Sequence, residues 1–198
     1  MIYVILGQPR TGTHLVMSIF ESHFKYTTAH YALDDEFNYL DNTIVHTHDV
    51  NFTVDSRIPL SNISLIVVKR RDIFAQLMSC KIAERSGQWT SYATNHIEPF
   101  NYHMSDFLKS LYESLKWYDD LDLGKMYNDI SVVYYEDILE FKDSYIQQKL
   151  GISNSNIQSQ PSPFKYKDII LNWESLKNQY NNIMRVYNVY GYHGCIRF

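Results

Sequence analysis

The sequence predicts an α/β fold: a single domain of three layers, in which helices flank a mostly parallel central sheet. Short apolar segments alternate along the chain with longer segments of helical periodicity, as in consecutive βαβ units. The apolar segments are continuous rather than alternating, which is typical of strands buried on both faces of a parallel sheet. Domains usually take about 100–200 residues. The 198 residues are therefore expected to form one domain, residues 1–198.

Strands are predicted where apolar residues run together, and helices where they recur at the spacing of a helical face. The strands are expected at residues 2–6, 43–48, 63–69 and 131–135. The helices are expected at residues 13–23, 72–85, 105–118, 137–150 and 168–187. Gly87 and Gly151 follow two of these helices, where glycine commonly ends a helix.

The carboxyl ends of the predicted strands carry the polar and basic segments of interest. These segments are residues 7–14, 46–49, 69–72 and 135–137. Ligands of parallel sheets bind beyond the carboxyl ends of the strands. Because parallel strands all end at one edge, we expect the four segments to converge there.

Composition and charge exclude several classes of protein. The chain is 45% hydrophobic and 20% charged, which indicates a globular protein. Its net charge of −4 argues against a bulk nucleic-acid binder. Cys80 and Cys195 form no disulfide framework, and no Cys/His spacing indicates a metal site. No apolar stretch approaches the roughly 20 residues of a membrane span, and Met1 leads into a strand rather than a signal peptide. We expect a cytoplasmic protein.

The segment from Gly7 to Gly12 has the G-x-x-x-x-G half of a phosphate-binding P-loop, placed between a strand and a helix. Backbone N–H groups and the positive end of the helix dipole would hold a phosphate there, so a P-loop-like fold is predicted. The nucleoside-triphosphate motif continues with Lys and Ser or Thr, whereas Thr13 and His14 follow here and the basic residue is Arg10. The alternative is a strand–turn–helix in which the glycines serve geometry alone.

This rearranged loop resembles the 5′-phosphosulfate loop of sulfotransferases that use 3′-phosphoadenosine 5′-phosphosulfate (PAPS), usually Pro-Lys/Arg-Ser/Thr-Gly-Thr/Ser-Thr. The matching residues are Pro9, Arg10, Thr11, Gly12, Thr13 and His14, the last being a mild departure. The resemblance implies that the loop binds PAPS, that 3′-phosphoadenosine 5′-phosphate (PAP) is the product, and that no metal is used. Arg10 would stabilise charge on the leaving phosphate oxygen.

Two further segments resemble the same superfamily. Arg71 and Ser79, eight residues apart, match the Arg and Ser that bind the 3′-phosphate. The sequence patterns of residues 70–79 and 86–89 most resemble those of bacterial glycolipid and carbohydrate sulfotransferases. Lys69 and Arg70 are expected to point away from the ligand. Taken without the loop, the three basic residues 69–71 would also fit a solvated basic patch. Tyr135 would lie near the adenine, as the first residue of a family-like Tyr-Glu-Asp. Beyond residue 151 the likeness is loose.

Two residues remain candidates for the general base. His48 resembles a histidine that follows a strand in the family, and an ordinary histidine pKa of about 6.5 suits a base near neutrality. Glu36 resembles the base of some glycolipid sulfotransferases. Their non-catalytic alternatives are a hydrogen-bonded histidine at a strand end and an exposed acid in a loop. We rank His48 first and keep Glu36.

The predicted function is transfer of the sulfuryl group from PAPS to an acceptor hydroxyl of a sugar, glycolipid or small molecule, by in-line displacement. A P-loop kinase or NTPase is one alternative, and it predicts Lys at position 13 and an Asp at the end of an apolar strand. Neither is present: position 13 is Thr, and the strand expected at residues 63–69 ends in basic residues. A non-catalytic nucleotide-binding module is the other, and it would lose the base. Nucleic-acid and membrane partners are not expected, and the acceptor and the oligomeric state stay open.

Overall fold

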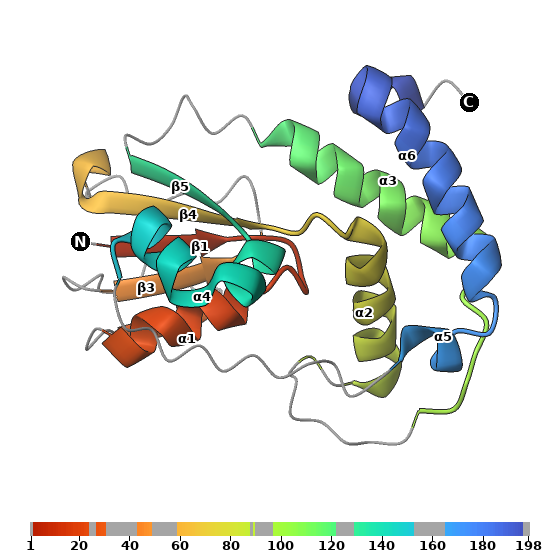
Figure 1. Cartoon of the computed structure of the whole chain (residues 1–198), viewed down its shortest axis with the longest axis horizontal. Coiled ribbons are helices and arrows are strands. Elements are labelled where there is room, and N and C mark those ends of the chain that lie inside the picture. The colour runs from red at the N-terminus through yellow and green to blue at the C-terminus, as the bar shows by residue number, and fades with distance from the viewer. Residues whose placement is uncertain are drawn as a thin grey trace. The chain divides into compact units, whose positions relative to one another are not determined.

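The computed structural model describes residues 2–23, 27–30, 43–48, 59–87, 89, 97–121, 129–152 and 165–195 (Figure 1). The chain forms two compact units. We call Met1–Arg71 with Asp122–Ser159 the sheet unit, and Asp72–Leu121 with Gln160–Phe198 the helical unit. The single domain expected from chain length stays a prediction.

The sheet unit is built on a five-stranded sheet with the order β2-β3-β1-β4-β5. Every neighbouring pair of strands is parallel, which confirms the predicted fold class. The strands are β1 Ile2–Leu6, β2 Thr27–His30, β3 Thr43–Thr47, β4 Ile63–Lys69 and β5 Asp129–Tyr134. A short 3₁₀ turn, Leu60–Asn62, leads into β4. β2 was not predicted from the sequence.

The register of the sheet brings the strand ends together. Leu6 of β1 lies opposite Thr47 of β3 and Val67 of β4, and Lys69 of β4 lies opposite Tyr134 of β5. The carboxyl ends therefore share one edge, as predicted. β1, the first strand of the chain, is central, with β3 on one side and β4 on the other. The strand order reverses at β1, and open α/β sheets bind ligands at the strand ends beside such a reversal.

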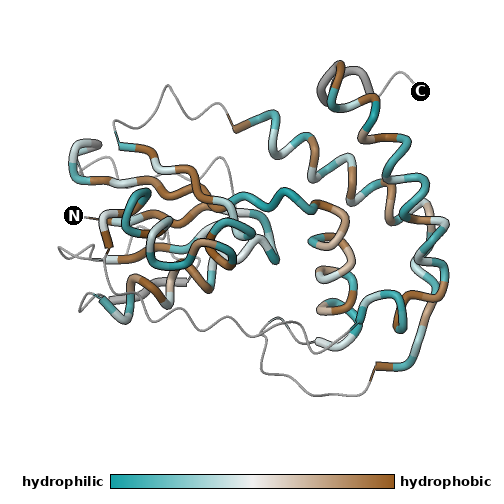
Figure 2. Tube along the Cα trace, viewed as in Figure 1, coloured by the Kyte–Doolittle hydropathy of each residue, from teal (hydrophilic) through white to brown (hydrophobic). Residues whose placement is uncertain are grey.

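Two helices, α1 Thr13–His23 and α4 Tyr135–Leu150, pack on one face of this sheet. The central strands β1 and β4 are largely apolar (Figure 2). Ile5 and Ile66 of the sheet pack with Phe20 of α1 and Ile146 of α4 in one buried cluster. Lys142, with φ 45° and ψ −124°, interrupts α4. Burial of this apolar face fixes α1, and with it the loop that precedes it.

The helical unit contains α2 Ile73–Ser86, α3 Met104–Asp120, α5 Tyr166–Ile169 and α6 Trp173–Cys195. Asp72 caps α2 by accepting a hydrogen bond from the Ala75 N–H at 2.9 Å, and Gly87 ends it with a φ of 67°. Its core is aromatic and aliphatic, with Phe107 and Leu111 of α3 fully buried. None of the described helices is both long and apolar enough to cross a membrane.

The final helix departs from the prediction of one continuous helix over residues 168–187. The chain is extended at Ile170, between α5 and α6, and Ile170 pairs with Phe100 in an isolated parallel bridge. The side-chain amide of Asn172 also accepts from the Tyr102 N–H at 3.0 Å and donates to its carbonyl at 2.8 Å. These long-range backbone bonds replace helical ones, so tertiary pairing overrides the local periodicity.

Replacing Leu111 by Ala should lower the free energy of unfolding by about 2–5 kcal/mol, because the truncated side chain leaves a cavity in the core of the helical unit. Glu113→Ala, on the exposed side of the same helix, should change it by no more than about 0.5 kcal/mol. Urea unfolding of both variants is the measurement. Equal losses would mean that α3 does not pack through this face.

Candidate functional site

The loop between β1 and α1 is a compact turn tied to its own backbone. The Thr11 N–H and the Thr11 hydroxyl both donate to the Gln8 carbonyl, at 3.2 and 2.7 Å. The Gly7 N–H donates to the Thr47 carbonyl at 3.2 Å, which joins the loop to the end of β3. The Gly12 carbonyl accepts the first hydrogen bonds of α1. The turn therefore delivers the chain directly into the N-terminus of the helix.

Glycine is required at both ends of this turn. A Cβ at position 7 would lie 2.8 Å from the Val68 carbonyl oxygen and 2.6 Å from the Thr11 hydroxyl. Gly12 has a φ of 96°, and a Cβ there would lie 2.4 Å from Cδ2 of the Tyr135 ring. Arg10 also has a positive φ, 65°, a backbone conformation that residues other than glycine rarely adopt. The loop thus combines close backbone approach with two left-handed residues.

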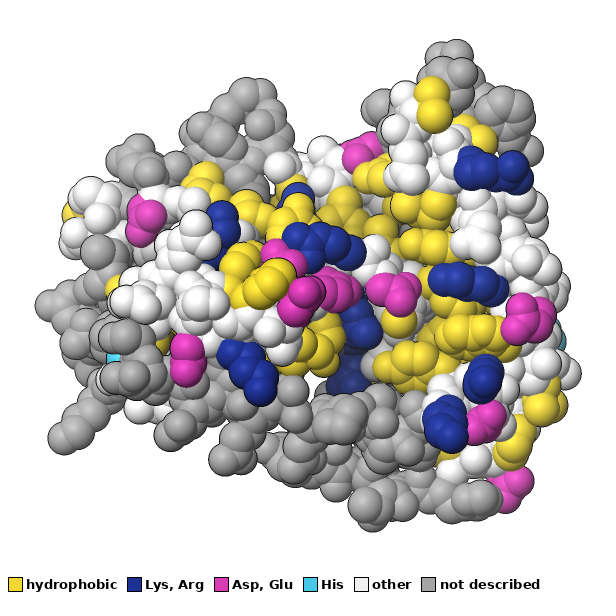
Figure 3. All heavy atoms as spheres, viewed as in Figure 1, with side chains coloured by type: hydrophobic (Ala, Val, Ile, Leu, Met, Phe, Trp, Pro, Cys, Tyr) yellow, Lys and Arg dark blue, Asp and Glu magenta, His cyan; other side chains and the backbone are white. Residues whose placement is uncertain are grey.

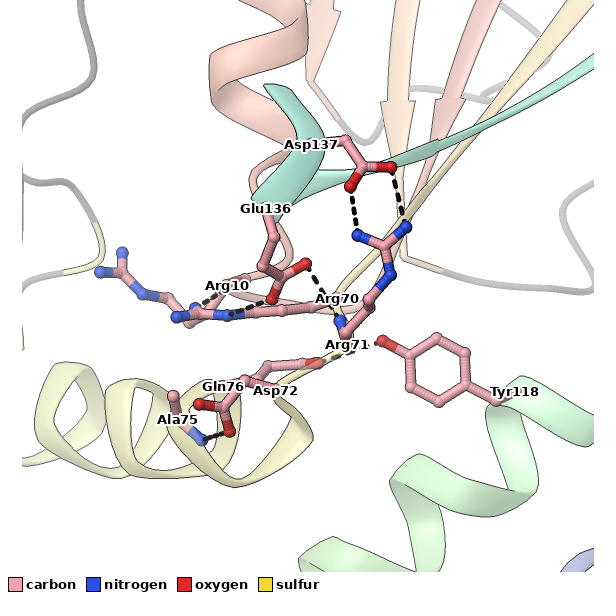
Figure 4. A network of polar contacts seen from close by, with 9 residues as sticks. All are labelled: Arg10, Arg70, Arg71, Asp72, Ala75, Gln76, Tyr118, Glu136 and Asp137. Atoms are coloured by element: carbon pink, nitrogen blue, oxygen red, sulfur yellow. Dashed lines mark hydrogen bonds and ion pairs between the residues drawn. The ribbon is translucent and has the colours of Figure 1, made fainter. Parts of the chain in front are cut away.

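Arg70, which was not predicted from the sequence as a ligand residue, lies against this loop (Figure 4). Its guanidinium donates to the Arg10 carbonyl at 3.1 Å and lies 4.9 Å from the centroid of the Tyr135 ring. Its Nε is 3.8 Å from a Glu136 oxygen, and its side chain is only 14% exposed. Sequence reasoning missed this residue. The strand register explains its position. Lys69 pairs with Tyr134, so Arg70 and Tyr135, the residues that follow, leave β4 and β5 side by side.

Arg71 is held by the first turn of α4. Its guanidinium makes a two-pronged ion pair with Asp137, one prong being 2.8 Å, and lies 4.1 Å from the centroid of the Tyr134 ring. Its backbone N–H donates to Glu136 at 3.1 Å. The hydrogen bonds from Arg71 lower the pKa of the Asp137 carboxyl, and the same bonds raise the pKa of Arg71. Half of the side chain, 51%, remains exposed.

His48 follows β3, and its ring is held by the loop. Its Nδ1 makes a hydrogen bond with the Gly7 carbonyl. A carbonyl only accepts, so Nδ1 carries the hydrogen and Nε2 the lone pair. Burial lowers the pKa of His48 from 6.5, with the Gly7 hydrogen bond acting weakly in the opposite direction. The imidazole is therefore neutral at pH 7, with its basic nitrogen directed away from the loop carbonyl.

His46 lies beside His48, and His14 lies beside His46. The His46 ring is fully buried and lies edge-on to the His48 ring, with 4.6 Å between centroids. His14 is exposed at the start of α1, and its ring centroid lies 5.1 Å from that of His46. Among the residues that the structure describes, no group of three or more His, Cys, Asp or Glu side chains is placed to hold a metal ion.

The other predicted site residues divide into three groups. Pro9 and Arg10 are partly exposed and Thr13 is buried, all within the loop. Ser79 is buried on α2, in the helical unit. Glu36 lies outside the described residues. The sheet unit therefore brings together the loop, His48, Arg71 and Tyr135, while Ser79 belongs to the other unit.

Charge at the sheet edge is balanced rather than broadly basic. The face in Figure 3 shows Lys and Arg side chains close to Asp and Glu side chains. Glu136 and Asp137 stand in the first turn of α4, where the positive end of the helix favours acidic groups. In Figure 4 the Arg10 side chain extends away from both carboxylates. Of the two arginines beyond β4 and Arg10, only Arg10 is drawn pointing away from the carboxylates of α4.

Replacing Gly12 by Ala should lower the free energy of unfolding by at least about 1 kcal/mol more than Gly151→Ala. Both glycines have a positive φ, 96° and 69°, but a Cβ at position 151 meets nothing within 4 Å. Gly151→Ala therefore reports the backbone cost alone, about 1–2 kcal/mol. Chemical denaturation measures both. Equal losses would show that Tyr135 does not press on the loop.

Comparison of the chain with protein-family models gives no match, and a search of curated proteins finds no matching relative.

Proposed function

We propose that this chain is a sulfotransferase that moves the sulfuryl group of PAPS to an acceptor hydroxyl. One observation carries the proposal: a turn suited to an anion holds a neutral histidine through its own backbone. The turn has Arg10 and a left-handed Gly12 at the N-terminus of α1, and its Gly7 carbonyl fixes His48. An anion site and a base thus meet at one sheet edge.

The loop and the start of α1 suit the 5′-phosphosulfate of the donor. Helix N-termini bind phosphate groups through exposed backbone N–H groups and the helix dipole. Arg10 extends away from the carboxylates of α4, and it would stabilise the negative charge that develops on the phosphate oxygen as the S–O bond breaks. A cation in this role replaces the metal of a triphosphate site, so we expect no metal requirement.

The nucleotide end of the donor would contact residues that follow β4 and β5. Arg71 is half exposed, and its pair with Asp137 uses two of the five guanidinium N–H donors. Donors that remain suit the 3′-phosphate. The Tyr135 ring, which packs against Gly12, would lie near the adenine. The contribution of Ser79 stays a prediction of the sequence.

His48 is suited to take the proton of the acceptor hydroxyl. As the acceptor oxygen bonds to sulfur, the bridging S–O bond to PAP breaks and the hydroxyl proton passes to Nε2. The hydrogen bond from Nδ1–H to the Gly7 carbonyl would steady the imidazolium that forms. General-base help of this kind is worth about 10²–10⁴ in rate. Glu36 stays the alternative base, and we expect a sugar, glycolipid or small-molecule acceptor in the cytoplasm.

Isothermal titration calorimetry should show that the protein binds PAP and that ATP with Mg²⁺ gives no comparable heat. The loop lacks the Lys of a triphosphate site, and Arg10 suits a metal-free anion. Arg10→Met should weaken PAP binding, whereas Lys116→Met, an exposed change on α3, should leave it unchanged. Tight binding of ATP with Mg²⁺ and none of PAP would support a kinase or NTPase instead.

His48→Ala should abolish PAPS consumption with a panel of sugar and glycolipid acceptors while PAP affinity stays near wild type. The exposed His23→Ala is the matched control. In the wild type, the neutral base is lost as the pH falls through the His48 pKa of the free protein, so kcat/KM should drop on the acid side with a midpoint below 6.5. Retained turnover in His48→Ala together with loss in Glu36→Gln would transfer the role to Glu36.

A further inference from the structure

The loop between β1 and α1 needs support from its surroundings. Arg10 and Gly12 both have positive φ values, and at Arg10 this backbone conformation is unfavourable because the residue carries a side chain. Such a conformation persists only where neighbouring groups determine it. In the sheet unit, those groups come from the residue after β4 and from the first turn of α4.

Arg70 and Tyr135 hold the two left-handed positions. Arg70 donates to the carbonyl of Arg10 at 3.1 Å, and the Tyr135 ring lies where a Cβ on Gly12 would project. The Arg70 guanidinium in turn lies 4.9 Å from the centroid of that ring. Glu136 completes the arrangement, with a carboxylate oxygen 3.8 Å from Nε of Arg70 (Figure 4).

We propose that Arg70 is a positioning residue, which with Tyr135 and Glu136 forms a clamp that keeps the loop in its anion-binding shape before any ligand arrives. The name "clamp" refers to these three residues. The inference rests on the proposed function, because it takes the loop as the site of the phosphosulfate. It also assigns the adjacent arginines different roles: Arg70 orders the loop, and Arg71 faces solvent.

The contacts distinguish a positioning role from direct ligand binding. The Arg70 side chain is 14% exposed and lies beside Glu136, so its charge is largely balanced within the protein. Arg71, at 51%, is far more accessible. A guanidinium can donate to a carbonyl, lie over a ring and meet a carboxylate at once because it is planar and has five donors. Lysine, with a single ammonium group, can keep the charge but not all three contacts.

Hydrogen exchange of the unliganded protein tests the clamp without relying on the ligand. The Thr11 amide, which bonds to Gln8 within the loop, should exchange about tenfold faster in Arg70→Met, because one charge-assisted hydrogen bond to the loop is lost. The Ile66 amide, in the middle of β4, should be unchanged and serves as the internal reference. Arg71→Met is the matched control, and should leave the Thr11 amide within about twofold of wild type.

Calorimetry with PAP then connects the clamp to binding. Arg70→Met should raise the Kd of PAP by about the same factor as the exchange rate, and Arg70→Lys should restore only part of both. Unchanged exchange in Arg70→Met with weakened PAP binding would overturn the proposal, since Arg70 would then contact the ligand itself. Full rescue of both by Arg70→Lys would also overturn it, because charge alone would suffice.

Two further outcomes are separable. If the wild-type protein binds no PAP, the proposed function fails, while faster Thr11 exchange in Arg70→Met still supports the clamp. If Arg70→Met does not fold, Tyr135→Leu takes its place, since it removes the ring between Arg70 and Gly12. Faster Thr11 exchange in that variant supports the clamp, and unchanged exchange contradicts it.

Discussion

The close approach of backbone at the end of β1 is the constraint on which the rest of the site depends. Position 7 has no room for a Cβ beside the Val68 carbonyl, and position 12 has none beside Tyr135. The loop can therefore lie directly against β4 and the start of α4. That packing leaves the Gly7 carbonyl in reach of His48 and the Arg10 carbonyl in reach of Arg70. One tight turn thus contacts both a histidine and an arginine through its main-chain carbonyls.

Electrostatic balance at this edge follows from α4. Its first turn supplies Glu136 and Asp137, which the positive end of the helix stabilises. Each arginine after β4 finds one of these carboxylates: Arg70 lies beside Glu136, and Arg71 is paired with Asp137. Arg10 extends away from both acids. The carboxylates of α4 therefore balance the two arginines that follow β4.

Much of the sheet unit could be predicted because buried parallel strands are continuously apolar. The bounds of β1, β4 and α1 agree with the prediction, and the carboxyl ends converge as expected. β2, Thr27–His30, was not predicted because its four residues include a single apolar one, alanine, and so form no apolar run. The break at Ile170 escaped because pairing with Phe100, a contact distant in sequence, interrupts a regular helical pattern.

The site was harder to predict than the fold. The loop and His48 could be proposed from the sequence because the chemistry expected of them depends on residue type and on position after a strand. Arg70 and Arg71 could not be told apart, since the direction of a side chain beyond a strand end depends on the register with β5. The choice between His48 and Glu36 depends on long-range placement, and Glu36 lies outside the described residues.

A crystal structure with PAP bound is the most direct test of the central claim. We expect the 5′-phosphate to accept hydrogen bonds from the backbone N–H groups of the loop before α1, with Nε2 of His48 facing the place that the sulfuryl group would occupy. PAP bound away from this loop, or a loop occupied with His48 on the far side of the phosphate, would contradict the account.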